Sequence, residues 1–146
     1  MSNHLAIATV TAALREVVYE AIIGAVPGSD VSYARPAAAE AGEEADAKPH
    51  ANLFLYGITP NASRRNDDLP TRRADGGLVQ RPRAALDLHY LISFYGKDAE
   101  LEPQRMLGSV VRALHSRPAL SRASIQAAIG SRPFLAPSDL AEAPES

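Results

Sequence analysis

The stretch RAALDLHYLISFY, residues 83–95, alternates between two sets of side chains with a period of two. Successive side chains of a β-strand point to opposite faces, so this alternation predicts a strand of roughly 40 Å. One face would carry Ala84, Leu86, Leu88, Tyr90, Ile92 and Phe94. The other face includes Asp87 and His89, which predicts that it contacts water or a partner.

A second strand is predicted over residues 52–58 (NLFLYGI), because this stretch is apolar throughout. Leu53 and Leu55 would lie on one of its faces. The opposite face would carry Phe54, Tyr56 and Ile58. Strands with two apolar faces are typical of the centre of a sheet, covered on both sides. The two strands can pair as a long antiparallel hairpin.

Helices are predicted on either side of these strands. Residues 4–25 repeat apolar side chains at the spacing of an amphipathic helix. Pro103 suits the first position of a helix that ends near Ser116, and Ser121 caps a further helix that ends at Gly130. With a short strand over residues 30–35, the order is α-β-β-β-α-α. This order predicts an α+β fold: helices packed on a small, mostly antiparallel sheet with a long hairpin.

The length of 146 residues predicts one domain, which we place at residues 1–132. Residues 36–50 hold no large apolar side chain, which predicts a mobile acidic loop. Residues 59–80 form a long loop between the hairpin strands. Prolines and acids in residues 133–146 predict an extended or disordered tail.

Composition excludes several classes of protein. The net charge is −2 and there are no cysteines, so we expect neither a disulfide framework nor a thiolate metal site. No apolar stretch approaches the ~18–20 residues of a membrane span, and the N-terminal stretch lacks the basic start of a secretory signal. We expect a soluble, cytoplasmic protein without membrane contact.

Two acidic motifs are candidates for catalysis. Asp67 and Asp68 are adjacent in a charged loop, which does not give them the different environments that acid–base pairs need. We expect them to be solvated or salt-bridged. Asp87 and His89 are too few for a confident metal site, and we expect a hydrogen-bonded structural pair. The sequence holds no nucleophile elbow, glycine-rich phosphate loop or HExxH motif. We therefore expect no enzyme, no cofactor and no bound metal.

The long loop is rich in charge, and its charged residues are the candidate interface. The set is Arg64, Arg65, Asp67, Asp68, Arg72, Arg73, Arg81 and Arg83. Such arginines could bind the phosphates of a nucleic acid, which leaves a nucleic-acid-binding module as the alternative function. However, the loop lacks interleaved aromatic residues for base stacking, and the chain is slightly acidic. Mixed arginines and aspartates favour assembly, since arginine–carboxylate pairs fix the register of subunit contacts.

Three stretches together resemble a known family. They are NLFLYGITPNASRRNDDLPTR (residues 52–72), RPRAALDLHYLISFYG (81–96) and LEPQRMLGSVVRALHSRPAL (101–120). They resemble the N-terminal domain of the cap, or tail-terminator, proteins of extracellular contractile injection systems. These systems are phage-tail-like particles of the antifeeding-prophage and virulence-cassette type. The resemblance spans residues from about 4 to 140.

The resemblance implies structural work. Cap proteins of this family form a homo-hexameric ring on the end of the particle distal to the baseplate. The ring contacts the inner tube protein and the sheath protein, stops polymerisation and anchors the sheath. Related terminators share a similar α/β shape. The resemblance thus implies a non-enzymatic component that assembles in the cytoplasm, within a particle that can be released from the cell.

Overall fold

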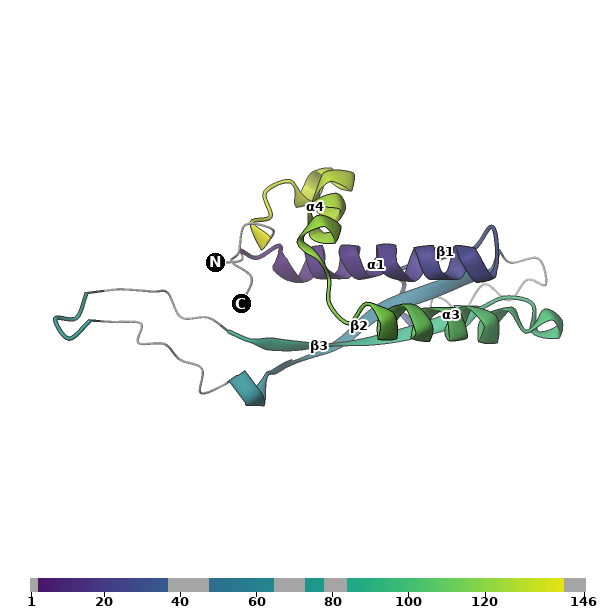
Figure 1. Ribbon diagram of the computed structural model, residues 1–146, viewed down its shortest axis with the longest axis horizontal. Coiled ribbons are helices and arrows are strands. Elements are labelled where there is room, and N and C mark those ends of the chain that lie inside the picture. The colour runs from purple at the N-terminus through teal and green to yellow at the C-terminus, as the bar shows by residue number, and fades with distance from the viewer. Residues whose placement is uncertain (1–2, 37–47, 65–72, 78–83, 141–146) are drawn as a thin grey trace.

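The computed structural model of the protein describes residues 3–36, 48–64, 73–77 and 84–140. Its helices are α1 (Ala6–Ala25), α3 (Glu102–Ser116) and α4 (Arg122–Ser131) (Figure 1). Its strands are β1 (Asp30–Ser32), β2 (His50–Pro60) and β3 (Leu86–Tyr95). Single 3-10 turns occur at η1 (Ala62–Arg64), η2 (Asp98–Glu100) and η3 (Pro133–Leu135).

The sheet has the strand order β1-β2-β3. The short strand β1 runs parallel to β2, whereas β2 and β3 pair antiparallel from His50 opposite Tyr95 to Pro60 opposite Leu86. The α+β class and the mostly antiparallel sheet with a long hairpin are therefore confirmed. The strand ends differ from the prediction, since β2 extends beyond residues 52–58 at both ends and β1 stops short of residue 35.

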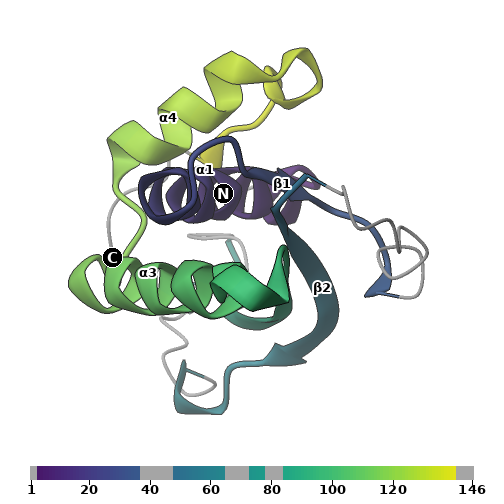
Figure 2. The ribbon, with the colours of Figure 1, turned by 90° about the vertical axis from the view of Figure 1, so that its right-hand side faces the viewer.

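The helices α1 and α3 lie side by side over one face of the sheet, and α4 packs against α1 (Figures 1 and 2). The amphipathic spacing of α1 and α3 places their apolar stripes toward the strands. The main core consists of the buried residues Val18, Ile22, Val26, Val31, Ala51, Leu53, Met106 and Val110. Tyr90, Ile92 and Phe94 of β3 pack against it from the sheet.

A β-bulge between Leu55 and Gly57 changes the facing of β2. Beyond the bulge, Ile58 pairs with Leu88, which shares a face of β3 with the core side chains. The prediction that Ile58 lies on the face of Phe54 is therefore wrong, because one extra residue reverses the alternation. The predicted cover on both sides is also wrong for this half of the strand, where Tyr56 is 63% and Ile58 46% exposed.

The described part of the C-terminal segment packs onto α1. Leu135 is completely buried in a second, small core with Ala12, Ala13 and Ala128. Nearby, the Thr9 and Ser138 hydroxyls share a 2.8 Å hydrogen bond, and the backbone N–H of Asn3 donates to Asp139 Oδ1 at 2.7 Å. The prediction of an extended or disordered tail is therefore wrong for residues 133–140. The prolines and acidic residues of this segment did not indicate the contact, because a single apolar residue, Leu135, provides the buried side chain. Residues 141–146 lie outside the described part, as do residues 37–47 of the predicted acidic loop.

Candidate assembly surface

The β2–β3 hairpin continues past the C-terminal end of α3 and ends below the N-terminal half of α1 in the view of Figure 1. We call its second half, from the bulge to the pair Pro60–Leu86, the arm. Antiparallel pairing continues through this half without a further register shift. The arm is therefore an ordered two-stranded ribbon that the described helices leave uncovered over much of its surface.

One face of the arm is apolar. It carries Ile58, Leu86 and Leu88, and it continues the sheet face that α1 and α3 cover nearer the core. Ile58 is 46% and Leu86 45% exposed, whereas Leu53 on the covered half is 1% exposed. An exposed apolar strip that continues from a core is typical of a surface that contacts another molecule.

The opposite face of the arm holds both polar residues that the strand pattern indicated. The Asn61 side-chain amide donates to Asp87 Oδ1 at 2.7 Å, and His89 Nε2 lies 2.9 Å from Thr59 Oγ1. The prediction of a hydrogen-bonded Asp87–His89 pair is wrong, because each side chain bonds across the hairpin instead. Across the described residues, no group of three or more histidines or acids could hold a metal ion. The Asn61–Asp87 and Thr59–His89 hydrogen bonds hold the two sides of the hairpin together in the arm.

Of the predicted charged interface, the structure describes Arg64 and Arg73. The Arg64 backbone N–H donates to Asn61 Oδ1 at 3.0 Å, which extends the bonds of the arm into η1. Arg73 begins a turn in which its N–H donates to the Gly77 carbonyl at 2.8 Å. Gly76, at φ +86°, supplies the left-handed backbone of this turn. The remaining members Arg65, Asp67, Asp68, Arg72, Arg81 and Arg83 lie outside the described residues, and the grouping stays a prediction.

Comparison with known protein families identifies the family of the chain. A model of the Pvc16 N-terminal domain matches residues 9–146, which is nearly the whole chain. The chain belongs to the Pvc16 N-terminal domain family. This membership connects it to phage-tail-like particles of the virulence-cassette type and confirms that part of the resemblance. Searches of curated proteins and of solved structures gave no significant match.

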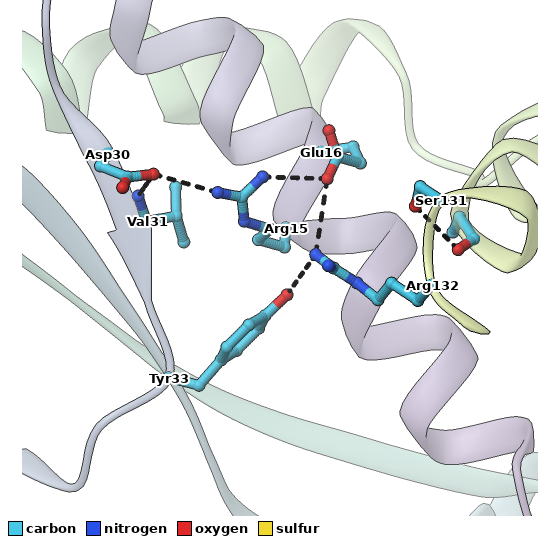
Figure 3. Close-up of polar contacts among 8 residues, drawn as sticks. Arg15, Glu16, Asp30, Val31, Tyr33, Ser131 and Arg132 are labelled. Atoms are coloured by element: carbon cyan, nitrogen blue, oxygen red, sulfur yellow. Dashed lines mark hydrogen bonds and ion pairs between the residues drawn. The ribbon is translucent and has the colours of Figure 1, made fainter. Parts of the chain in front are cut away.

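The chain also contains a polar cluster that the sequence analysis did not predict (Figure 3). Arg15 on α1 forms 3.0 Å ion pairs with Glu16 and with Asp30 at the start of β1. Arg132, directly after α4, lies 3.6 Å from the Glu16 carboxylate and donates to the Tyr33 hydroxyl at 3.0 Å. The cluster therefore ties α1, the β1 region and the end of α4 together. Its members are too far apart in the sequence for spacing to reveal it.

The arrangement of this cluster favours a structural role. The Arg15 side chain is 19% and the Arg132 side chain 23% exposed, while the carboxylates are more open to water. Such pairs contribute modestly to stability because water screens them. Among the residues that the structure describes, no helix is long and apolar enough to cross a membrane.

Proposed function

We propose that this protein is the structural cap of a contractile injection system. Six copies form a ring on the distal end of the inner tube and sheath, end polymerisation and anchor the sheath. The observation that carries the proposal is the family match over residues 9–146. The proposed role is assembly in the cytoplasm through protein contacts, without a catalytic site or cofactor.

The exposed arm supports a role in subunit contacts. A closed ring needs two different surfaces on each subunit, so that one surface of a copy meets the other surface of the next. An arm that extends past α3 and exposes Ile58, Leu86 and Tyr56 suits one of these surfaces. Permanent rings bury roughly 2,000 Å² or more at each contact, and they favour apolar side chains.

The decisive experiment is electron microscopy of particles from a strain that lacks this protein. We expect tubes and sheaths of uncontrolled length, or sheaths detached from their tubes. The wild-type gene supplied on a plasmid should restore particles of uniform length. Sheathed particles of normal length in the deletion strain would refute the proposal.

A variant of the arm tests the ring contact. Leu86→Asp places a charge in the apolar strip, and native mass spectrometry of the purified protein should show loss of the hexamer. Leu107→Asp is the matched control, because Leu107 on α3 is 48% exposed against 45% for Leu86. Equal loss of the hexamer in both variants would mean that the arm is not the specific contact. A wild-type protein that is monomeric would argue against a ring formed by this domain alone.

A further inference from the structure

An open groove runs between α1 and α3, with a volume of ≈ 530 Å³. Its walls are built from small residues, Ala21, Gly24 and Ala25 on α1 and Gly108 and Ala113 on α3. Walls of this kind allow the backbone of another chain to come close, as small residues do between packed helices.

The spacing of the two helices is fixed by hydrogen bonds. Ser109 Oγ donates to the Ala21 carbonyl at 2.7 Å, and Arg105 donates to the Ala25 carbonyl, also at 2.7 Å. Both bonds connect a side chain of α3 to the backbone of α1. The groove is therefore a preformed feature of this pair of helices.

The packing of the described chain does not require a glycine at position 108. It lies in the interior of α3, where glycine stabilises a helix less than alanine does. A Cβ added at Gly108 would meet no atom within 4 Å, and the same holds for Gly24 on the opposite wall. At Gly96, by contrast, a Cβ would lie 2.7 Å from Glu102 Oε2. The space above Gly108 is therefore available to another molecule.

The charges at the groove indicate what that molecule is. Arg112 of α3 and Arg117, the residue directly after α3, border the groove, and Glu20 of α1 borders it from the other side. Arg117 lies 3.3 Å from Glu20, but both side chains are more than half exposed, so this pair is easily exchanged. The Arg112 guanidinium has no hydrogen-bond or ion-pair partner among the described residues, and only the backbone carbonyl of this residue accepts a side-chain bond, from Ser116 Oγ at 2.9 Å.

We propose that this groove binds an acidic segment of another polypeptide chain. Carboxylates of the segment pair with Arg112 and Arg117, since the guanidinium fork bonds carboxylates in a bidentate manner. The backbone of the segment lies over Gly108 and Gly24. A nucleic acid fits less well, because the residues that line the groove include no aromatic side chain for base stacking. The inference is independent of the ring proposed above.

Fluorescence anisotropy with the purified full chain tests this proposal. The probe is a fluorescein-labelled peptide of alternating glutamate and alanine, and we expect saturable binding that weakens as salt is added. Gly108→Leu fills the groove without changing its charge, and it should weaken binding by about tenfold or more. Because leucine favours a helix over glycine, the melting temperature of this variant should not fall.

Charge variants complete the test. Arg112→Gln should also weaken the binding of the acidic peptide. Arg35→Gln is the matched control, since Arg35 is exposed and does not border the groove, and it should bind like the wild type. The proposal is overturned if the acidic peptide does not bind, or if Gly108→Leu binds it as well as the wild type does. Tighter binding of single-stranded DNA, lost in the same variants, would overturn it in favour of a nucleic-acid site.

Discussion

The two halves of the β2–β3 hairpin share one pairing pattern but have different surroundings. In the half near the core, Ala51 and Leu53 are buried under α1 and α3, with Ile92 and Phe94 beside them. Beyond the bulge, the same sheet face continues as the apolar strip of the arm, where Ile58 is 46% exposed. The pattern of apolar residues alone does not distinguish the two halves.

The difference in burial between the two halves predicts different effects of substitutions on folding and on contacts between molecules. Apolar area that leaves water in the monomer contributes about 25 cal/mol per Å² to folding, and the covered half supplies it. Part of the apolar area of the arm stays exposed to water in the monomer and so does not contribute to its folding. Substitutions in the covered half should therefore lower the free energy of unfolding, whereas substitutions in the arm should affect contacts between molecules.

The largest effect is expected at Leu53, which is 1% exposed. Leu53→Ala should lower the free energy of unfolding by about 2–5 kcal/mol, because it leaves a cavity in a packed core. Ile58→Ala on the arm should lower it by less than about 1 kcal/mol, since its environment is already half water. Urea denaturation measures both values. Similar losses in the two variants would remove the distinction between the halves.

A pair of glycines, one in the arm and one at the covered end, gives the next largest effect. A Cβ at Gly96 would lie 2.7 Å from Glu102 Oε2 and 2.8 Å from Glu102 Cβ. Gly96→Ala should therefore lower the free energy of unfolding by about 1–3 kcal/mol through overpacking. At Gly57 in the arm, a Cβ would make only ordinary 3.8 Å contacts with His89. Thermal denaturation should show Gly57→Ala close to the wild type, and a reversed order would contradict the comparison.

Tyr90 lies next to the boundary between the halves, where it is partly covered. Burial raises the pKa of its hydroxyl above 10.0, and the hydrogen bond with Thr11 partly offsets that rise. The folded state therefore favours the neutral phenol, whose stabilising effect is present below pH 10 and is lost as the pH rises through the raised pKa.

Tyr90→Phe should accordingly flatten the decline of stability in this alkaline range. At neutral pH the variant should lose about 0.5–1.5 kcal/mol with the Thr11 hydrogen bond. Denaturation midpoints measured between neutral and alkaline pH test both expectations, with the exposed Tyr56→Phe as the control. An unchanged alkaline decline in Tyr90→Phe would show that this hydroxyl is not the group responsible.

The smallest effect on folding is expected at the end of the arm. Leu86→Asp should change the free energy of unfolding of the monomer by no more than about 0.5 kcal/mol, because Leu86 is 45% exposed. Urea denaturation at low protein concentration, where subunit contacts are absent, provides the measurement. A loss comparable to that of Leu53→Ala would mean that the arm belongs to the folding unit.

The sequence by itself determined the elements that repeat a simple period. Alternation over residues 83–95 located β3, and helical spacing located α1, α3 and α4 within one or two residues of their ends. These predictions succeeded because backbone geometry fixes the direction of each side chain from its neighbours. The same local stretches carried the family resemblance.

Only the tertiary structure decided which apolar residues are covered. The bulge at Leu55–Gly57 places Ile58 on the same sheet face as the core residues, and Leu135 is buried in a core against α1. The pairing of Arg15 with Asp30 and the approach of Arg132 to Glu16 depend on three separate elements meeting. The groove over Gly108 exists only because α1 and α3 lie side by side. Burial and pairing between distant segments depend on their arrangement in space, and no local period of the sequence encodes that arrangement.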